Sequence, residues 1–179
     1  MKIRKVVVGG MLLAIGIVLP LALHATGIPQ VGQIFLPMHI PVLIAGFILG
    51  PFYGGIIGIL CPVLGTITMG MPAIDRMPFM IVELCVYGLI SGLLVRKFKP
   101  ASKKWGFLVC LIITQICGRL AYALSLVFAL GVLNITWASP VLAWAAVVKG
   151  IPGIIIQIVI IPIILAVLNK TGELKKLES

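Results

Sequence analysis

The sequence predicts an all-α integral membrane protein, a bundle of six transmembrane helices with both termini in the cytoplasm. Composition is the first reason, since 61% of the 179 residues are hydrophobic and only 10% are charged. Ordinary soluble domains are about 45–50% apolar and about 25% charged. A soluble fold of this size could not bury so much apolar surface. The composition therefore excludes a soluble enzyme, a nucleic-acid-binding protein and a disordered chain.

Chain length and the spacing of charges are the other two reasons. At about 20 residues per helix, the chain has room for roughly five to seven spans. No Lys, Arg, Asp or Glu occurs from residue 6 to residue 74. This stretch is too long for one helix, and its Pro and Gly residues divide it. We therefore expect residues 1–179 to form a single membrane domain.

The first helix is predicted over Val6–Leu23, an uncharged apolar run that follows Lys2, Arg4 and Lys5. A basic start followed by an apolar run is also typical of a signal peptide. Here the run is long for a signal peptide, and no clear A-x-A cleavage site follows it. We expect this helix to be retained in the protein.

Glycine, proline and polar residues separate the remaining spans. The first break is Gly27–Gln33, and the loops expected later are Gly70–Arg76, Arg96–Lys104 and Asn134–Pro140. Between these breaks lie five apolar runs, the first of them short and interrupted by two prolines. The predicted spans are Leu36–Gly50, Phe52–Met69, Met77–Val95, Trp105–Leu133 and Val141–Leu168.

The distribution of basic residues predicts which way the chain crosses the membrane. Eleven of the 14 Lys and Arg residues fall in Met1–Lys5, Arg96–Lys104 and Lys170–Ser179. Six spans place these three segments on one face, and the loops of the opposite face carry one Arg and one Asp. Because basic residues accumulate on the cytoplasmic side, both termini are predicted to be cytoplasmic. The net charge of +10 then reflects topology and not binding to nucleic acid.

Three charged residues fall inside the predicted spans: Glu83, Arg119 and Lys149. A charge at the bilayer centre costs at least about 2.5–3.5 kcal/mol, so such residues face the bundle interior and have a partner or a ligand. At about 1.5 Å per residue, Glu83 lies roughly 9 Å and Lys149 roughly 13 Å from the outer ends of their helices. Arg119 lies about halfway along its helix. All three reach depths expected for a pocket that opens outward.

Two interpretations of these charges remain open. In one, Glu83 pairs with Arg119 or Lys149, and the charges only fix helix packing. In the other, the second cation is left over and favours an anionic ligand such as a carboxylate. The planar fork of Arg119 is the better carboxylate ligand, and Lys149 is a second point charge or the partner of Glu83.

Other polar and aromatic residues accompany the charges. Gln115 and Tyr122 share a helical face with Arg119, and Trp144 lies in roughly the same sector of its helix as Lys149. Asn134 precedes the last helix, and His39 lies near the outer end of the second, where a packing role is the alternative. The candidate substrate-binding residues are therefore His39, Glu83, Gln115, Arg119, Tyr122, Asn134, Trp144 and Lys149.

Small residues recur at four-residue intervals, at Gly10 and Ala14 and again from Gly46 to Gly58. Such spacing lets helices approach closely, either inside the protein or against another membrane subunit. No cluster of His, Cys and carboxylates has metal-ligand spacing, and the four cysteines lie in apolar segments. No nucleotide-binding loop or catalytic motif occurs. We therefore expect no metal, no cofactor and no enzymatic activity in this chain.

Three segments resemble the substrate-binding S components of energy-coupling factor (ECF) vitamin transporters. They are Leu36–Pro51, the Gly54-Gly55-x-x-Gly58 motif and Gly70-Met71-Pro72. Within that family the chain is most similar to members assigned to pantothenate, although branches for folate, riboflavin and other vitamins share much of the pattern. The chain length, the six spans and the cytoplasmic termini fit the same resemblance.

The resemblance implies a place in the bacterial cytoplasmic membrane and three partner subunits. One is a transmembrane coupling subunit, and two are cytoplasmic ATPases. It implies that the vitamin is captured outside and released inside when the S component topples. Gly10 and Ala14 would replace the family's A-x-x-x-A docking motif, and the outer loops and the outer halves of the fourth to sixth helices would form the pocket. The alternatives are an S component for folate, riboflavin or a lipoate-like vitamin, a stand-alone channel or transporter, and a membrane enzyme or scaffold.

Overall fold

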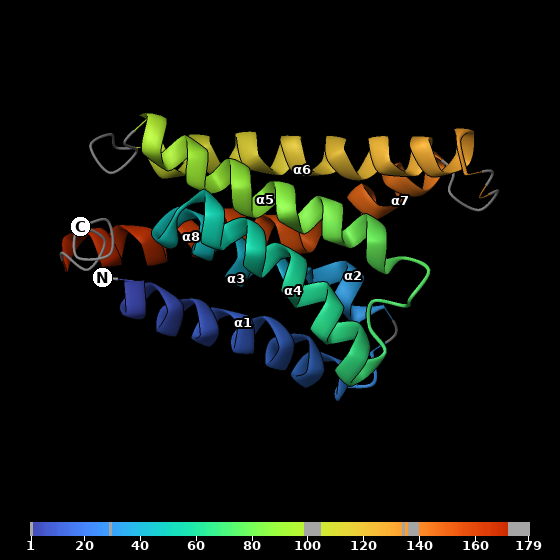
Figure 1. Ribbon diagram of the computed structural model, residues 1–179, viewed down its shortest axis with the longest axis horizontal. Helices are drawn as coiled ribbons and strands as arrows, with labels where there is room; N and C mark the ends of the chain where they lie inside the picture. Colours follow the sequence, from blue (N-terminus) through green and yellow to red (C-terminus); the bar gives the residue numbers. More distant parts are fainter. Residues whose placement is uncertain (1, 29, 99–104, 134, 136–139, 172–179) are drawn as a thin grey trace.

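The computed structural model describes residues 2–28, 30–98, 105–133, 135 and 140–171, and the regular structure in these residues is helical throughout. Six of the helical segments are long and apolar enough to cross a membrane, which confirms the predicted fold class. They run side by side along one direction, with α1 (Lys2–His24) and α6 (Gly106–Gly131) on opposite sides of the bundle (Figure 1). The start of α1 and the end of α8 (Ile151–Lys170) lie at the same end of the molecule, as an even number of spans requires.

Three of the predicted spans are confirmed nearly as written. Helix α4 covers Pro51–Met69, α5 covers Met77–Phe98, and α6 ends two residues before the predicted limit. Proline begins α4, where its missing N–H has no partner to lose. The positive φ of Gly50, 94°, forms the tight turn before it, a backbone conformation that glycine adopts at little cost.

The second span is a broken helix, and the sequence did not reveal its first part. The short helix α2 (Val31–Phe35) lies within the predicted break, and α3 (His39–Leu49) follows it. Leu36 separates them with a φ of 50°, and Pro37 cannot supply the N–H that a continuous helix needs there. The broken backbone is buried within the bundle, which is where irregular backbone is tolerated at membrane depth.

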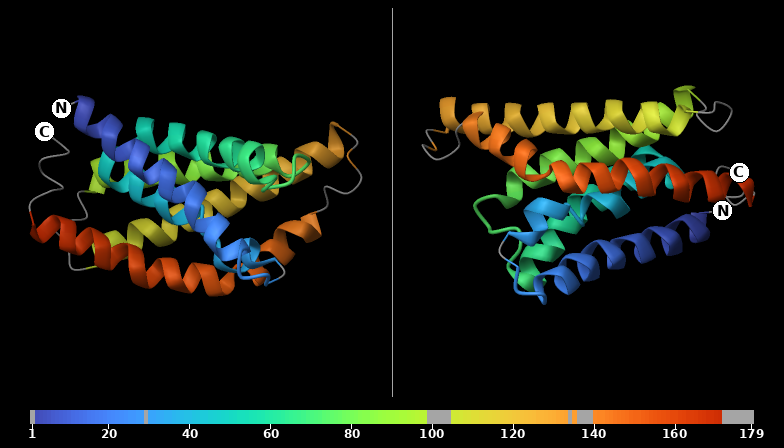
Figure 2. Two further views of the ribbon diagram at one scale, coloured as in Figure 1. Left: turned by 90° about the horizontal axis from the view of Figure 1, so that it is seen from below. Right: turned by 180° about the vertical axis from the view of Figure 1, so that it is seen from behind.

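The predicted sixth span is wrong in its first half. The structure divides Val141–Leu168 into α7 (Pro140–Lys149) and α8, which meet at Gly150 (Figure 2). Pro152 lies in the first turn of α8, where its missing N–H costs no hydrogen bond, and so fits a new helix that begins there. Lys149 is therefore the last residue of α7, and the transmembrane segment begins after it.

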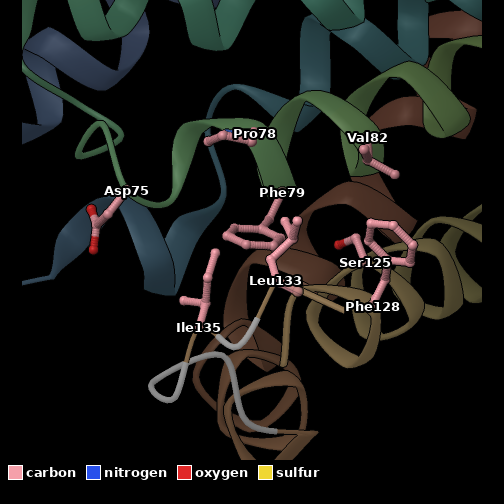
Figure 3. Close-up of a pocket in the computed structure, with 9 residues that line it drawn as sticks. Asp75, Pro78, Phe79, Val82, Ser125, Phe128, Leu133 and Ile135 are labelled. Carbon is pink, nitrogen blue, oxygen red and sulfur yellow. The ribbon is translucent and has the colours of Figure 1, made fainter. Parts of the chain in front are cut away.

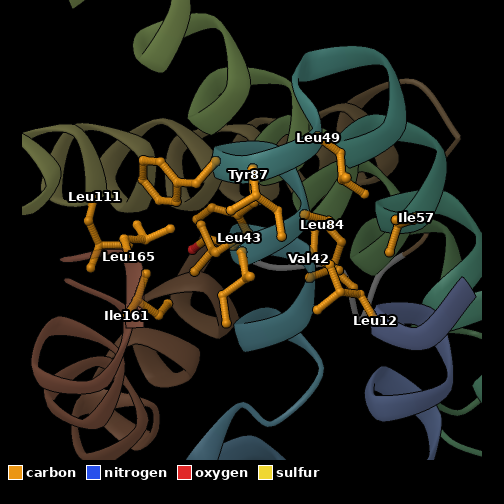
Figure 4. Packing of buried hydrophobic residues seen from close by; sticks show 14 of the residues in the cluster. Leu12, Val42, Leu43, Leu49, Ile57, Leu84, Tyr87, Leu111, Ile161 and Leu165 are labelled. Carbon is orange, nitrogen blue, oxygen red and sulfur yellow. The ribbon is translucent and has the colours of Figure 1, made fainter. Parts of the chain in front are cut away.

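The core forms where α3 and α5 meet their neighbours. Helix α5 packs against α3, α4 and α6, and α3 also touches α1 and α8. Apolar side chains from all six of these helices fill the interior (Figure 4), among them Leu12, Val42, Leu43, Leu49, Ile57, Leu84, Tyr87, Leu111, Ile161 and Leu165.

Glycines bring α3, α4 and α5 into backbone contact. A Cβ atom on Gly46 or on Gly54 would meet the carbonyl oxygen of Gly88, and a Cβ atom on Gly58 would meet the backbone at Leu84. Small residues allow such approaches, and dispersion contacts then hold the helices together in the absence of a hydrophobic driving force in lipid. The glycine repeat from Gly46 to Gly58 therefore serves internal packing and not the docking of another subunit.

Candidate functional site

Two of the charged residues predicted within the spans form a buried ion pair. Arg119 Nη1 on α6 lies 3.0 Å from Glu83 Oε1 on α5. The side chain of Glu83 is 3% exposed and that of Arg119 is 13% exposed. Because isolated charges are costly at this depth, pairing lets both residues lie inside the bundle. Arg119, and not Lys149, is the partner of Glu83.

A histidine and a tyrosine complete this group. His39, the first residue of α3, places Nε2 3.6 Å from Glu83 Oε1. Its ring packs edge-on against Tyr87 with ring centroids 5.3 Å apart. Tyr87 follows Glu83 by one turn of α5 and is fully buried. We refer to His39, Glu83, Tyr87 and Arg119 as the charged cluster.

The charged cluster holds more hydrogen-bonding atoms than its members use. Among the described residues, none accepts a hydrogen bond from Arg119 Nε or Nη2, and neither the Tyr87 hydroxyl nor a ring nitrogen of His39 makes one, although His39 Nε2 lies 3.6 Å from the Glu83 carboxylate. These atoms are buried, where an unmade hydrogen bond costs about 1–3 kcal/mol. Nε and Nη2 form one edge of the planar guanidinium, the edge that faces away from Glu83, and a carboxylate can accept from both at once.

Gln115 lies one turn from Arg119 but belongs to a separate hydrogen-bond chain. Its Nε2 donates to Gln157 Oε1 on α8, and Gln157 Nε2 donates to the Leu36 carbonyl oxygen at 3.4 Å. This chain joins α6, α8 and the break between α2 and α3. Sequence reasoning did not identify Gln157, although it is a polar residue in an otherwise apolar span.

Lys149 lies outside the charged cluster. Its Nζ donates to Gln30 Oε1 at 2.9 Å, and both side chains are exposed. The expectation of two buried cations against one carboxylate is therefore wrong, because the break at Gly150 moves Lys149 to the outer end of the sixth span. Arg119 does approach this break, since a Cβ atom on Gly150 would lie 2.9 Å from Arg119 Nη2.

The other predicted residues have different surroundings. Tyr122 is half-buried and packs with Phe79, Leu126 and Ala143 at the outer end of the bundle. The side chain of Trp144 is exposed on α7, apart from the charged cluster, and such a Trp is typical of a membrane interface. The predicted residue Asn134 lies outside the described residues.

A pocket lies between the outer ends of α5 and α6. Its volume is about 310 Å³, and its walls are almost wholly apolar (Figure 3). The lining residues include Phe79 and Val82 from α5, Phe128 from α6, and Leu133 and Ile135 beyond it. This is the region where the family resemblance implied a pocket, although the sequence did not single out these lining residues.

The two small residues proposed for docking lie on the surface. Gly10 and Ala14 are exposed on α1, and no atom lies within 4 Å of a Cβ atom built on Gly10. By contrast, Gly9 and Gly16 of the same helix are buried against the bundle. The face of α1 that carries Gly10 and Ala14 is therefore open to lipid or to another membrane protein.

A family comparison identifies the class of this protein. The model of the family described as "ECF transporter, substrate-specific component" matches residues 4–165, which is most of the chain. The chain belongs to this family. The S component matches no curated protein and no solved structure.

Membership gives the S component its general role. Proteins of this family are substrate-binding subunits of transporters and are not enzymes. The S component is thus the substrate-capture subunit of an ECF importer, and membership of the family implies association with ECF coupling and ATPase subunits and a vitamin substrate. Its six apolar helices and its family place it in the cell membrane as a multi-pass protein.

Proposed function

We propose that this S component captures a small carboxylate vitamin from outside the cell, with pantothenate as the leading candidate. The unpartnered Nε and Nη2 edge of Arg119 carries the proposal. Two parallel hydrogen bonds from a guanidinium edge match the geometry of a carboxylate. Folate, riboflavin and lipoate-like vitamins are the alternatives, and the two that carry a carboxylate could use the same edge.

Glu83 acts in this proposal as a positioning residue. By holding Nη1 at 3.0 Å, it turns the opposite edge of the guanidinium away from itself. His39 lies on the same carboxylate oxygen at 3.6 Å and shares that negative charge with Arg119. With Lys149 outside the charged cluster, the attraction for a carboxylate comes from this free hydrogen-bonding edge and not from a surplus of fixed positive charge.

Uptake also requires the partner subunits. We propose that the exposed face around Gly10 and Ala14 docks on the transmembrane coupling subunit, which connects the S component to two cytoplasmic ATPases. Both residues lack bulk, so a partner helix can approach the backbone of α1 closely. Release inside would then follow when the S component topples in the membrane.

A ligand screen on the purified protein tests the substrate. Pantothenate, folate, riboflavin and lipoate are compared by thermal shift, and the dissociation constant of the best ligand is measured by calorimetry. Removing one partner of a desolvated charge pair typically costs about 2–5 kcal/mol. Arg119→Ala should therefore weaken binding roughly 30-fold or more. Arg96→Ala, in the last turn of α5, is the control and should leave binding unchanged.

Arg119→Ala leaves Glu83 without its partner and could fail to fold, so a second variant is needed. Arg119→Lys keeps a positive charge beside Glu83 but loses the planar fork. It should fold and still bind weakly. An amide analogue of the ligand should bind poorly to the wild type and lose little more in Arg119→Lys. If both variants fold and bind like the wild type, the charged cluster is only structural.

A further inference from the structure

The Glu83 carboxylate lies between a permanent cation and a side chain that can become one. Its Oε1 is 3.0 Å from Arg119 Nη1 and 3.6 Å from His39 Nε2. The side chains of Glu83 and His39 are each 3% exposed, and neither ring nitrogen of His39 makes a hydrogen bond among the described residues. A protonated imidazole donates from both ring nitrogens, so a proton on His39 would supply the donor that Glu83 lacks on this side.

The fold holds His39 beside Glu83. Its backbone N–H, at the start of α3, donates to the Leu36 carbonyl oxygen at 3.1 Å. Its ring packs edge-on against Tyr87. The Tyr87 ring is held in turn by α6, because a Cβ atom on Gly118 would overlap it. The imidazole therefore stays close to the Glu83 carboxylate whether or not it carries a proton.

Other charges lie far from His39 in the part of the chain that the structure describes. Helix α3 packs against α1, α4, α5 and α8. The basic residues of α1 lie at its start and those of α5 and α8 in their last turns, whereas α4 carries no charged residue. Glu83 and Arg119 are thus the two charges beside His39. The remaining titratable groups of these helices are His24 of α1, Tyr53 and Cys61 of α4, and Cys85 and Tyr87 of α5.

The empty cluster balances its charge without a proton on His39. Glu83 contributes −1 and Arg119 contributes +1. A carboxylate bound to the free Nε and Nη2 edge of Arg119 would change the sum to −1, with one guanidinium between two carboxylates. A net charge inside the membrane is costly, and a buried charge is tolerated when it is paired. The bound state therefore needs one more positive charge next to Glu83.

We infer that the S component binds its carboxylate together with one proton, and that His39 takes up this proton. The proton comes from water, and no bond of the carboxylate changes. Nε2–H of His39 then donates to Glu83 Oε1, and the four charged groups again sum to zero. Imidazole suits this role because its charge ordinarily changes between about pH 5 and 8. The inference rests on the proposed function and adds a second bound species to the same site.

Proton uptake is measured by calorimetry of the purified, tag-free protein in buffers of equal pH but different ionisation enthalpy. The probes are pantothenate, folate and lipoate, and riboflavin is the comparison without a carboxylate. At about pH 8, binding of a carboxylate should take up at least about half a proton, and its affinity should fall at least about threefold per pH unit. Binding of riboflavin should take up none.

Two variants assign the proton to His39. His39→Gln keeps a hydrogen-bonding side chain but cannot carry the charge. It should abolish proton uptake and make the affinity independent of pH, with a loss of roughly tenfold at about pH 6. His24→Gln is the matched control, because His24 is the chain's other histidine and lies in the last turn of α1. It should change neither quantity.

A further measurement needs no change at His39. In His24→Gln protein labelled at its histidine rings, the NMR signal of the remaining histidine, His39, should change to that of the protonated ring when the carboxylate is added at about pH 8. Glu83→Gln removes one of the two carboxylates, so Arg119 and the ligand balance each other. Carboxylate binding by this variant should take up no proton.

The outcomes separate this inference from the proposed function. If binding depends on Arg119 but takes up no proton, or if His39→Gln takes up as much as the wild type, the inference fails and the carboxylate site stands. If binding is independent of Arg119, the proposed function fails. If none of the three carboxylates binds the wild type, both are wrong.

Discussion

The first two spans are both apolar, yet they have opposite places in the structure. In an 18-residue stretch of the second span, Val31–Leu49, 72% of the residues are buried inside the protein, and in such a stretch of the first, Ile3–His24, only 22% are. The first span is nevertheless the more apolar of the two. In a membrane, hydropathy therefore indicates that a helix enters the bilayer, but not whether it faces lipid or protein.

Small residues and backbone contacts explain the difference. Lipid tails are as apolar as leucine, so a helix becomes buried where its backbone can approach others closely. Gly46 of the second span meets the backbone of Gly88, whereas Gly10 of the first has open space around it. The same residue type thus makes a core contact in one helix and leaves an open face on the other.

The largest difference is expected between two single variants, Gly46→Leu in the second span and Gly10→Leu in the first. Gly46→Leu would drive a side chain into Ser91 and the Gly88 carbonyl, and overpacking against rigid backbone has no cheap relief. We expect no folded, monodisperse protein from Gly46→Leu, measured by size-exclusion chromatography in detergent. Gly10→Leu should elute like the wild type and unfold at the same temperature. Equal behaviour of the two variants would contradict the comparison.

The next effect concerns the open face of α1. Gly10→Leu or Ala14→Leu should lower vitamin uptake by the complete transporter by about tenfold or more, because a bulky side chain separates the two helices. The affinity of the isolated S component for its ligand should not change. Uptake of labelled vitamin into proteoliposomes and calorimetry measure the two quantities. An equal loss of both would mean that this face contributes to the binding fold itself.

A smaller effect tests the orientation of α5 in the membrane. Asp75 and its neighbours should face the outside, and the basic end of α5 should face the cytoplasm. In a background without native cysteines, a membrane-impermeant thiol reagent added to intact cells should label Ala73→Cys several-fold more than Lys97→Cys. Both positions are exposed, so burial does not confuse the result. The reverse pattern would overturn the predicted topology.

The smallest effect is expected at the contact between α2 of the second span and α7. Lys149 donates to Gln30 at the surface, and exposed polar contacts of this kind contribute little to stability. Lys149→Ala should change ligand affinity less than about threefold and leave the unfolding temperature nearly unchanged. A loss as large as that of Arg119→Ala would return Lys149 to the binding site.

The sequence was most informative about one face of α6. The spacing of Gln115, Arg119 and Tyr122 predicted that they share a face, and all three are at least partly buried there. Periodicity along a helix is a local property that the sequence carries in full. It could not show that Gln115 would bind Gln157, because that contact joins residues far apart in the chain.

The two broken helices limited what could be predicted about the site. Gly150 and Pro152 were visible in the sequence, but an apolar run of that length also fits one long span. Reading it so placed Lys149 inside the membrane and gave the bundle a second buried cation. Pro37 was likewise visible, yet the short helix α2 before it, which packs against α1, α7 and α8, has no local signal in the sequence.

By itself, the sequence determined that this protein crosses the membrane and where most of its spans run, and it placed Glu83 and Arg119 inside them, but it wrongly added Lys149. The spans and the two buried charges follow from the bilayer, which demands apolar runs of about 20 residues and makes every charge inside them costly. Only the tertiary structure decided that Arg119 pairs with Glu83, that His39 and Tyr87 join them, and that an apolar pocket lies beyond. Those facts depend on which helices are neighbours, and that depends on backbone contacts between glycines that no local pattern records.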